Sequence, residues 1–114
     1  MNNTPLFRLL VFSLGLVSFL SCTKDKFETD PCYSLSYAET VRPLVETKCA
    51  LAGCHVSGFQ PGDFTRYEVL KQKAQEGKIQ LMVFNLGNMP PVNKLTEQEK
   101  SQLKCWVESG ALKD

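Results

Sequence analysis

The residues best suited to chemistry lie in one short stretch, KCALAGCHVSG, from Lys48 to Gly58. Four residues separate Cys49 from Cys54, and His55, the only histidine of the chain, directly follows the second cysteine. Two thiols and an imidazole in this pattern are compatible with three kinds of site. These are a covalent haem attachment site, half of a zinc site, and a disulfide beside an unrelated histidine.

Haem attachment explains the adjacency of Cys54 and His55 most directly. In this chemistry two cysteine thiols add to the vinyl groups of the haem, and the histidine beside the second cysteine binds the iron through Nε2. The usual motif has two residues between the cysteines, whereas this chain has four. Small residues in this interval allow the loop to bulge, so the motif remains compatible with haem.

A second axial ligand for the iron has to come from another segment and be held rigidly. Met89, in the stretch GNMPP, lies 34 residues beyond His55 and is followed by two prolines that stiffen its segment. Met82 lies inside an apolar helical pattern and is interpreted as core filler. Since the chain has no second histidine, Met89 is the candidate distal ligand.

The chain has five cysteines, an odd number: Cys22, Cys32, Cys49, Cys54 and Cys105. Lipidation of Cys22 would leave four, for which sequence alone permits three pairings. We predict a disulfide between Cys32 and Cys105, with Cys49 and Cys54 in the cofactor site. The alternative is two disulfides, including a small Cys49–Cys54 loop, and no cofactor.

The N-terminal segment resembles a bacterial lipoprotein signal. It carries one positive charge, Arg8, followed by an apolar run from Leu9 to Leu20 that is short for a membrane span. Ser21, a small residue, then precedes Cys22. The resemblance implies cleavage before Cys22 and acylation of that cysteine, which would export the protein and anchor it to a bacterial membrane.

Three regions are therefore expected: a signal peptide over residues 1–21, a lipidated flexible tether over residues 22–35, and a folded domain over residues 36–114. The segment before the cleavage site holds one of the 13 Lys and Arg residues and none of the 12 acids. The mature chain thus has 12 of each sign and a net charge near zero. This balance gives no reason to expect nucleic acid as a partner.

The folded domain is expected to be all-α. Helical spacing of apolar residues runs over 36–49, where Pro43 indicates either a kink or a helix that starts near Arg42. Two further helices are predicted over 65–77 and 78–87, and residues 88–95 should be extended because of their prolines. A last helix begins at Thr96, which has capping-box spacing with Glu99, and ends at Gly110.

The order of these motifs resembles a small class I cytochrome c domain. The similarity runs from Tyr37 to Leu112, through VRPLVETKCALAGCH, GDFTRYEVL and NMPP to the ending WVESGA. It is greatest to the lipoprotein-type versions of Bacteroidetes and Planctomycetes. The family fold would have three to four helices wrapped around one covalent haem c, with the last helix crossing the first.

The resemblance also implies the roles of the site residues. Cys49 and Cys54 would hold the haem, with His55 as proximal and Met89 as distal iron ligand. Since protein would fill both axial positions, the expected function is transfer of single electrons between redox protein partners, and not enzymatic catalysis.

Four other interpretations are weaker or less complete. A zinc site would need a second ligand pair that is not evident, and a Cys-His enzyme would need a third group to orient its base. A peroxidase would require Met89 to be off the iron. The main alternative is a disulfide-stapled lipoprotein without haem that acts as a binding or assembly module.

Overall fold

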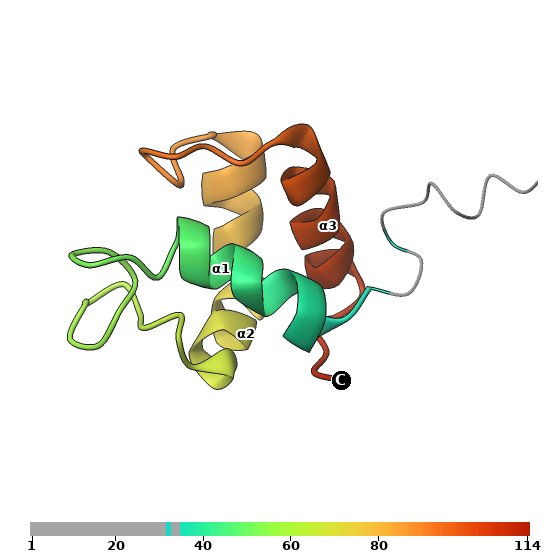
Figure 1. The fold of residues 1–114 in the computed structure, drawn as a ribbon, viewed down its shortest axis with the longest axis horizontal. Coiled ribbons are helices and arrows are strands. Elements are labelled where there is room, and N and C mark those ends of the chain that lie inside the picture. The colour runs from blue at the N-terminus through green and yellow to red at the C-terminus, as the bar shows by residue number, and fades with distance from the viewer. Residues whose placement is uncertain (1–31, 33–34) are drawn as a thin grey trace, which may run out of the picture.

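A computed structural model of the chain describes Cys32 and residues 35–114. The predicted signal peptide, and the predicted tether apart from Cys32 and Leu35, lie outside the described residues. In the described part the protein is helical and has no strand, which confirms the all-α class (Figure 1). Its elements are η3 (Tyr37–Val41), α1 (Arg42–Lys48), α2 (Tyr67–Gln75), η4 (Gln80–Asn85) and α3 (Glu97–Glu108).

The first helix runs without a break from η3 into α1. It opens as a π-helix capped by Ser36, whose Oγ accepts a hydrogen bond from the Glu39 N–H at 3.0 Å. At Arg42 it becomes an α-helix, and Pro43 lies in the first turn of α1. Proline has no N–H to donate and is tolerated there, so the predicted disturbance takes the form of a change in helix type.

The last helix begins and ends as predicted. Thr96 Oγ1 accepts from the Glu99 N–H at 3.2 Å, and the Glu99 carboxylate accepts from the Thr96 N–H at 2.7 Å. This reciprocal pair is a complete capping box. At the other end, α3 stops at Glu108, two residues before Gly110.

An aromatic cluster joins the two ends of the domain. The ring of Trp106 on α3 lies 5.7 Å from the ring of Tyr37 on η3, and Tyr37 lies 5.0 Å from Tyr67 on α2. Tyr37 and Trp106 are buried, and the Trp106 indole N–H donates to the Leu112 carbonyl at 2.9 Å. The last helix therefore packs against the start of the first one, through Trp106 and Tyr37.

The remaining core packs between the same helices. Four aliphatic side chains from three helices are almost completely buried, and they belong to a single hydrophobic cluster. They are Val41, Val45, Leu70 and Leu103.

The predicted disulfide is confirmed. Cys32 and Cys105 are bonded, with their Cα atoms 5.2 Å apart and a sequence separation of 73. Cys105 lies on the buried side of α3. The bridge therefore ties a residue of the predicted tether to the C-terminal helix.

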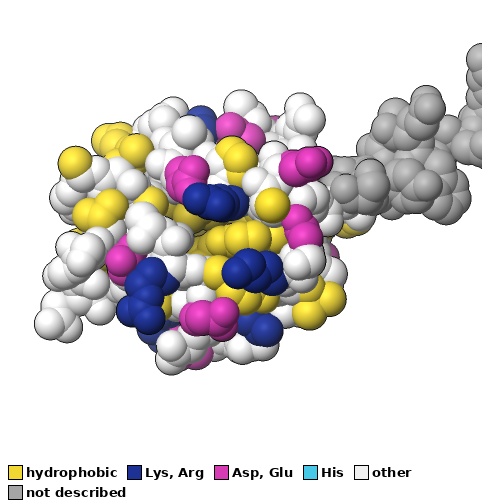
Figure 2. Space-filling model, turned by 60° about the horizontal axis from the view of Figure 1, so that its bottom comes forward, with side chains coloured by type: hydrophobic (Ala, Val, Ile, Leu, Met, Phe, Trp, Pro, Cys, Tyr) yellow, Lys and Arg dark blue, Asp and Glu magenta, His cyan; other side chains and the backbone are white. Residues whose placement is uncertain are grey.

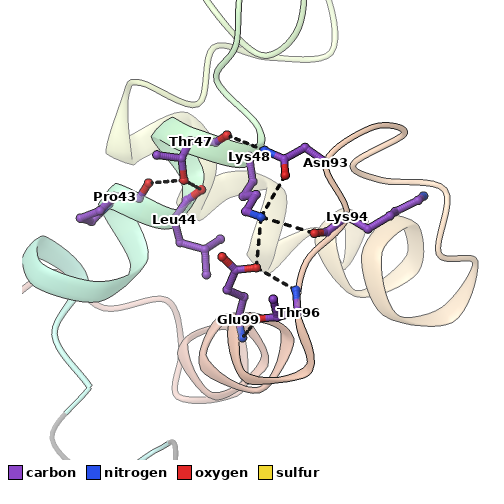
Figure 3. Close-up of polar contacts among 8 residues, drawn as sticks. All are labelled: Pro43, Leu44, Thr47, Lys48, Asn93, Lys94, Thr96 and Glu99. Carbon is purple, nitrogen blue, oxygen red and sulfur yellow. Dashed lines mark hydrogen bonds and ion pairs between the residues drawn. The ribbon is translucent and has the colours of Figure 1, made fainter.

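The segment between η4 and α3 bends rather than running fully extended, and Asn93 adopts a positive φ of 50°. A polar network holds it against the end of α1 (Figure 3). Lys48 Nζ donates to the Asn93 side chain at 3.2 Å and to the Lys94 carbonyl at 3.4 Å, and it also pairs with Glu99 at 3.4 Å. The prolines exclude a helix here, as predicted, but the contacts of Lys48 determine the course of the backbone.

The surface has charges of both signs. Figure 2 shows a face on which hydrophobic side chains form a central patch bordered by basic and acidic ones. Within the residues that the structure describes, no helix has the length and apolar character needed to cross a membrane.

Candidate functional site

The four residues predicted to bind the cofactor line one cavity. It has a volume of about 540 Å³, within the range of roughly 300–1,000 Å³ that is usual for small-molecule and cofactor sites. Its walls are largely apolar and come from α1, the loop after it, α2, η4, the loop after η4, and α3. Cys49, Cys54, His55 and Met89 all contribute to its surface.

Two long loops carry these residues, and both extend to the same side of the helices (Figure 1). The first follows α1 and is held by backbone hydrogen bonds. The His55 N–H donates to the Cys49 carbonyl at 3.1 Å, and the Cys54 N–H donates to the Leu51 carbonyl at 2.8 Å. The four-residue interval between the cysteines therefore folds into a tight turn, which brings the histidine back to the first cysteine.

A backbone carbonyl fixes the imidazole of His55. Nδ1 lies 3.1 Å from the Gly62 carbonyl oxygen, which can only accept a hydrogen bond, so Nδ1 carries the hydrogen. Burial lowers the pKa of His55 below its usual 6.5, and the bond to Gly62 opposes this shift. The ring is therefore neutral at pH 7, and Nε2 keeps the lone pair with which an imidazole binds a metal.

Two phenylalanines of the same loop pack against this imidazole. Phe64 stacks on it, with ring centroids 3.9 Å apart and planes 5° apart, and Phe59 meets it edge-on at 5.0 Å. The Phe64 N–H also donates to the His55 carbonyl at 2.9 Å. Both phenylalanines line the cavity.

Gly62 can hold its carbonyl near His55 because it has no side chain. Its φ is +128°, and a Cβ added there would lie 2.9 Å from Val69 Cγ1 on α2. Both the backbone angle and the close approach require glycine. The position of the His55 ring thus depends on the packing of this loop on α2.

Cys49 and Cys54 are free thiols. The small Cys49–Cys54 disulfide of the alternative interpretation is therefore not formed. Burial, with a smaller contribution from Cys54, raises the pKa of Cys49 from 9.0 to about 11. Cys49 thus keeps its proton at neutral pH, inside a largely apolar wall.

Met89 and Met82 lie next to each other, on opposite sides of the turn that ends η4. The N–H groups of Asn88 and Met89 both donate to the Met82 carbonyl, at 3.0 and 3.1 Å. Both methionines line the cavity. The interpretation of Met82 as core filler is wrong, because Met82 is only partly buried and lies outside the hydrophobic core.

A smaller cavity of about 390 Å³ adjoins the first one. Val83 and Met89 line both, and the remainder of its wall comes from η4, the loop after it and the first turns of α3. Met89 therefore lies on the wall between two hollows.

The donor groups fit haem better than zinc. An apolar cavity with two thiols, a neutral imidazole and a thioether is the set that a covalent haem with His and Met ligands needs. Zinc needs several ligands converging on one point. Among the described residues, no three His, Cys, Asp or Glu side chains gather closely enough to hold a metal ion.

Sequence reasoning did not identify the residues that support the site. Phe59, Gly62 and Phe64 position His55, and Lys48 holds the loop that carries Met89. Two phenylalanines in a loop rich in glycine and proline were a usable signal, because apolar side chains in such a loop usually pack against something. Nothing in the sequence around Lys48 indicated that it would contact the loop that carries Met89.

No protein-family model matches the chain, and comparisons with curated proteins and with solved structures likewise found no match.

Proposed function

We propose that this protein is a membrane-anchored monohaem c-type cytochrome that transfers single electrons between redox protein partners. The observation that carries the proposal is the shared cavity: Cys49, Cys54, His55 and Met89 come from two separate loops and line the same apolar hollow. The proposed fold is correspondingly a small cytochrome c-like fold, with its helices wrapped around one haem c.

Cys49 and Cys54 would hold the haem covalently. Each Sγ would form a carbon–sulfur bond to one carbon of a vinyl group, and the thiol hydrogen would go to the other carbon. The addition consumes no oxidant or reductant, so two free thiols are the required starting state.

His55 and Met89 would serve as the two axial ligands. Haem iron supplies reversible one-electron exchange between its ferric and ferrous states. The Nδ1–H bond to Gly62 orients the imidazole and leaves Nε2 for the metal. Occupied axial positions leave no place for a substrate, which favours electron transfer over catalysis.

The proposed location is outside the cytoplasm, on the periplasmic or cell-surface face of a bacterial membrane. The support is the sequence of residues 1–22, which ends in Ser21 and Cys22 after an apolar run. Lipid on Cys22 would tether the domain there. The disulfide between Cys32 and Cys105 agrees with an oxidising compartment.

The first test is a visible spectrum of the protein expressed with a cytochrome c maturation system, recorded oxidised and reduced. A sharp reduced α band, together with haem that stays on the chain in a denaturing gel, is the expected result. A colourless protein would contradict the proposal.

The axial ligands are tested by substitution. His55→Ala should abolish the low-spin spectrum, and Met89→Ala should keep the haem attached but open the sixth position. Because Met82 lines the same cavity, Met82→Leu is the matched control and should leave the spectrum unchanged. If Met82→Leu altered the spectrum and Met89→Ala did not, the distal ligand would be Met82.

The alternative is a lipoprotein without haem that acts as a binding or assembly module and is stapled by disulfides. The Cys32–Cys105 bridge fits it, but the two free thiols do not. A thiol count separates the alternatives. The haem protein should show no free thiol at Cys49 or Cys54 and two thioether bonds by mass spectrometry, whereas the stapled protein should show a Cys49–Cys54 disulfide that reductant opens.

A further inference from the structure

The charged residues around the main cavity all have one sign. Three lysines line it, Lys48, Lys73 and Lys78, and none of the described residues that line it is Asp or Glu. Most of the remaining wall is apolar. An occupant that suits such a cavity has an apolar body and negative charge at its edge.

Two of the three lysines already have a carboxylate partner. Lys48 pairs with Glu99 at 3.4 Å, and it also donates to Asn93 and Lys94 in the network of Figure 3. Lys73 pairs with Glu76 at 3.0 Å on the last turn of α2. The positive charges of Lys48 and Lys73 are therefore already paired with carboxylates of the protein.

Lys78 differs from both. It lies in the short connection between α2 and η4, is exposed to solvent, and within the described part of the chain takes part in no ion pair and no side-chain hydrogen bond. Glu76, two residues before it in sequence, already accepts bonds from Lys73 and Gln72, and Lys78 acts on Glu76 only as the last of several charges and hydrogen bonds that lower its pKa. The ammonium group of Lys78 is thus available to a ligand at the cavity edge.

We propose that Lys78 binds a carboxylate of the molecule that fills this cavity. This inference rests on the proposed function and deepens it, because haem is an apolar ring that carries two propionate carboxylates at one edge. Lys78 would then neutralise one propionate and fix which edge of the ring faces the connection between α2 and η4.

Such a contact would change the reduction potential of the haem iron. A negative propionate stabilises ferric iron over ferrous iron, because the ferric state carries one more positive charge. A cation paired with that propionate offsets the effect and raises the reduction potential. Removing the cation should therefore lower the potential.

The test is a potentiometric titration of the matured protein and its variants at physiological ionic strength, where charges farther apart than about 8 Å are largely screened but a contact at the cavity edge is not. Lys78→Met should lower the potential, corresponding to a factor of about two to five in the one-electron equilibrium constant, the range for exposed charge pairs. Lys78→Glu should lower it further, and Lys78→Arg should keep it near the wild-type value.

Lys71→Met is the matched control. Lys71 lies on α2, outside the cavity wall, with its Nζ 5.7 Å from the centre of the Tyr67 ring. Its neutralisation changes the net charge equally and should leave the potential near wild type. Circular dichroism checks that each variant keeps its helices, and Lys78→Gln repeats the neutralisation with a polar side chain.

The two failures are distinguishable. If the wild-type protein acquires haem but the Lys78 variants have the potential of the Lys71 control, the role of Lys78 is wrong and the cytochrome proposal stands. If the wild-type protein acquires no haem under maturation, both proposals are overturned.

Discussion

The imidazole of His55 depends on one backbone atom, the Gly62 carbonyl oxygen. A carbonyl cannot be removed by substitution, but its position can be disturbed through the residue that carries it. Gly62 packs against α2 and has a φ that L-residues rarely adopt. Its conformation therefore connects the packing of α2 with the geometry of the candidate iron ligand.

Gly62→Ala should destabilise the protein by about 1–3 kcal/mol, because strain at a positive φ and the contact with Val69 act together. Gly58→Ala is the matched control, since Gly58 also has a positive φ, +85°, but nothing lies within 4 Å of an added Cβ. Urea unfolding measures both variants. Equal losses for the two would show that the contact with Val69 contributes nothing.

Cys49 should react slowly with alkylating reagents in protein that lacks haem. The thiolate is the reactive form, and burial raises the pKa of this thiol to about 11. The thiolate fraction, and with it the alkylation rate, should rise about tenfold per pH unit between roughly pH 8 and 10. Peptide mass spectrometry measures the rate at Cys49. A rate that is already constant above pH 8 would show that the thiol is not protected.

Among the elements, η3 is anchored by a residue from the opposite end of the chain. The Asp114 carboxylate accepts from the Tyr37 N–H at 2.6 Å, from the Ala38 N–H at 2.9 Å, and from Ser36 Oγ at 2.5 Å. The N–H groups of Tyr37 and Ala38 lie at the start of a helix, where backbone N–H groups have no partner inside the helix. The carboxylate also suits the positive end of the helix dipole.

The Asp114 contacts predict a pH dependence. Hydrogen bonds from Ser36, Ala38 and Tyr37 hold the pKa of Asp114 below its usual 3.8. The stabilisation is therefore complete above pH 3.8 and is lost as the pH falls through the lower, folded-state pKa. Asp114→Asn should be less stable than wild type at pH 6, and the difference should shrink towards pH 2.

Denaturant unfolding at several pH values measures this effect. Glu108→Gln serves as control, because Glu108 is an exposed acid whose ion pair, to Lys104 at 3.8 Å, lies within α3. A loss for Asp114→Asn that was the same at every pH would argue against a role for the ionised carboxylate.

For the molecule as a whole, the Cys32–Cys105 bridge closes almost the entire domain into one loop. A domain of about 80 residues has a small core, so a covalent link contributes a large share of its stability. The bridge, the aromatic cluster and the Asp114 contacts all join the start of the domain to α3 or to the residues that follow it.

Replacing both cysteines, Cys32→Ser with Cys105→Ser, should lower the free energy of unfolding by about 4 kcal/mol, the chain-entropy value for a loop of 73 residues. Guanidinium unfolding of the matured protein measures the loss. Wild-type protein treated with reductant should match the variant, because the thioether bonds proposed for Cys49 and Cys54 would resist reduction. If the double variant unfolded at the wild-type denaturant concentration, the bridge would contribute nothing to stability.

Several features were predictable because their causes are local. The capping box of α3 requires only Thr96 and Glu99 at the right spacing, and the absence of helix over 88–95 follows from consecutive prolines. The count of five cysteines, with Cys22 assigned to lipid and Cys49 and Cys54 to a cofactor site, also favoured the Cys32–Cys105 pairing. Periodicity of apolar residues then predicted the helices, within a few residues at their ends.

Other features depend on contacts between segments far apart in sequence, which no local pattern encodes. Met82 was taken for core filler because its neighbours are apolar, but the turn after η4 places it beside Met89 in the cavity wall. Lys48 and Asp114 likewise gain their roles only when α1 meets the loop before α3 and when the chain end meets η3. Residue type and spacing were thus enough to predict the helical class and to select the candidate ligands. Which side chains share the cavity follows from packing in three dimensions, and only the folded chain shows it.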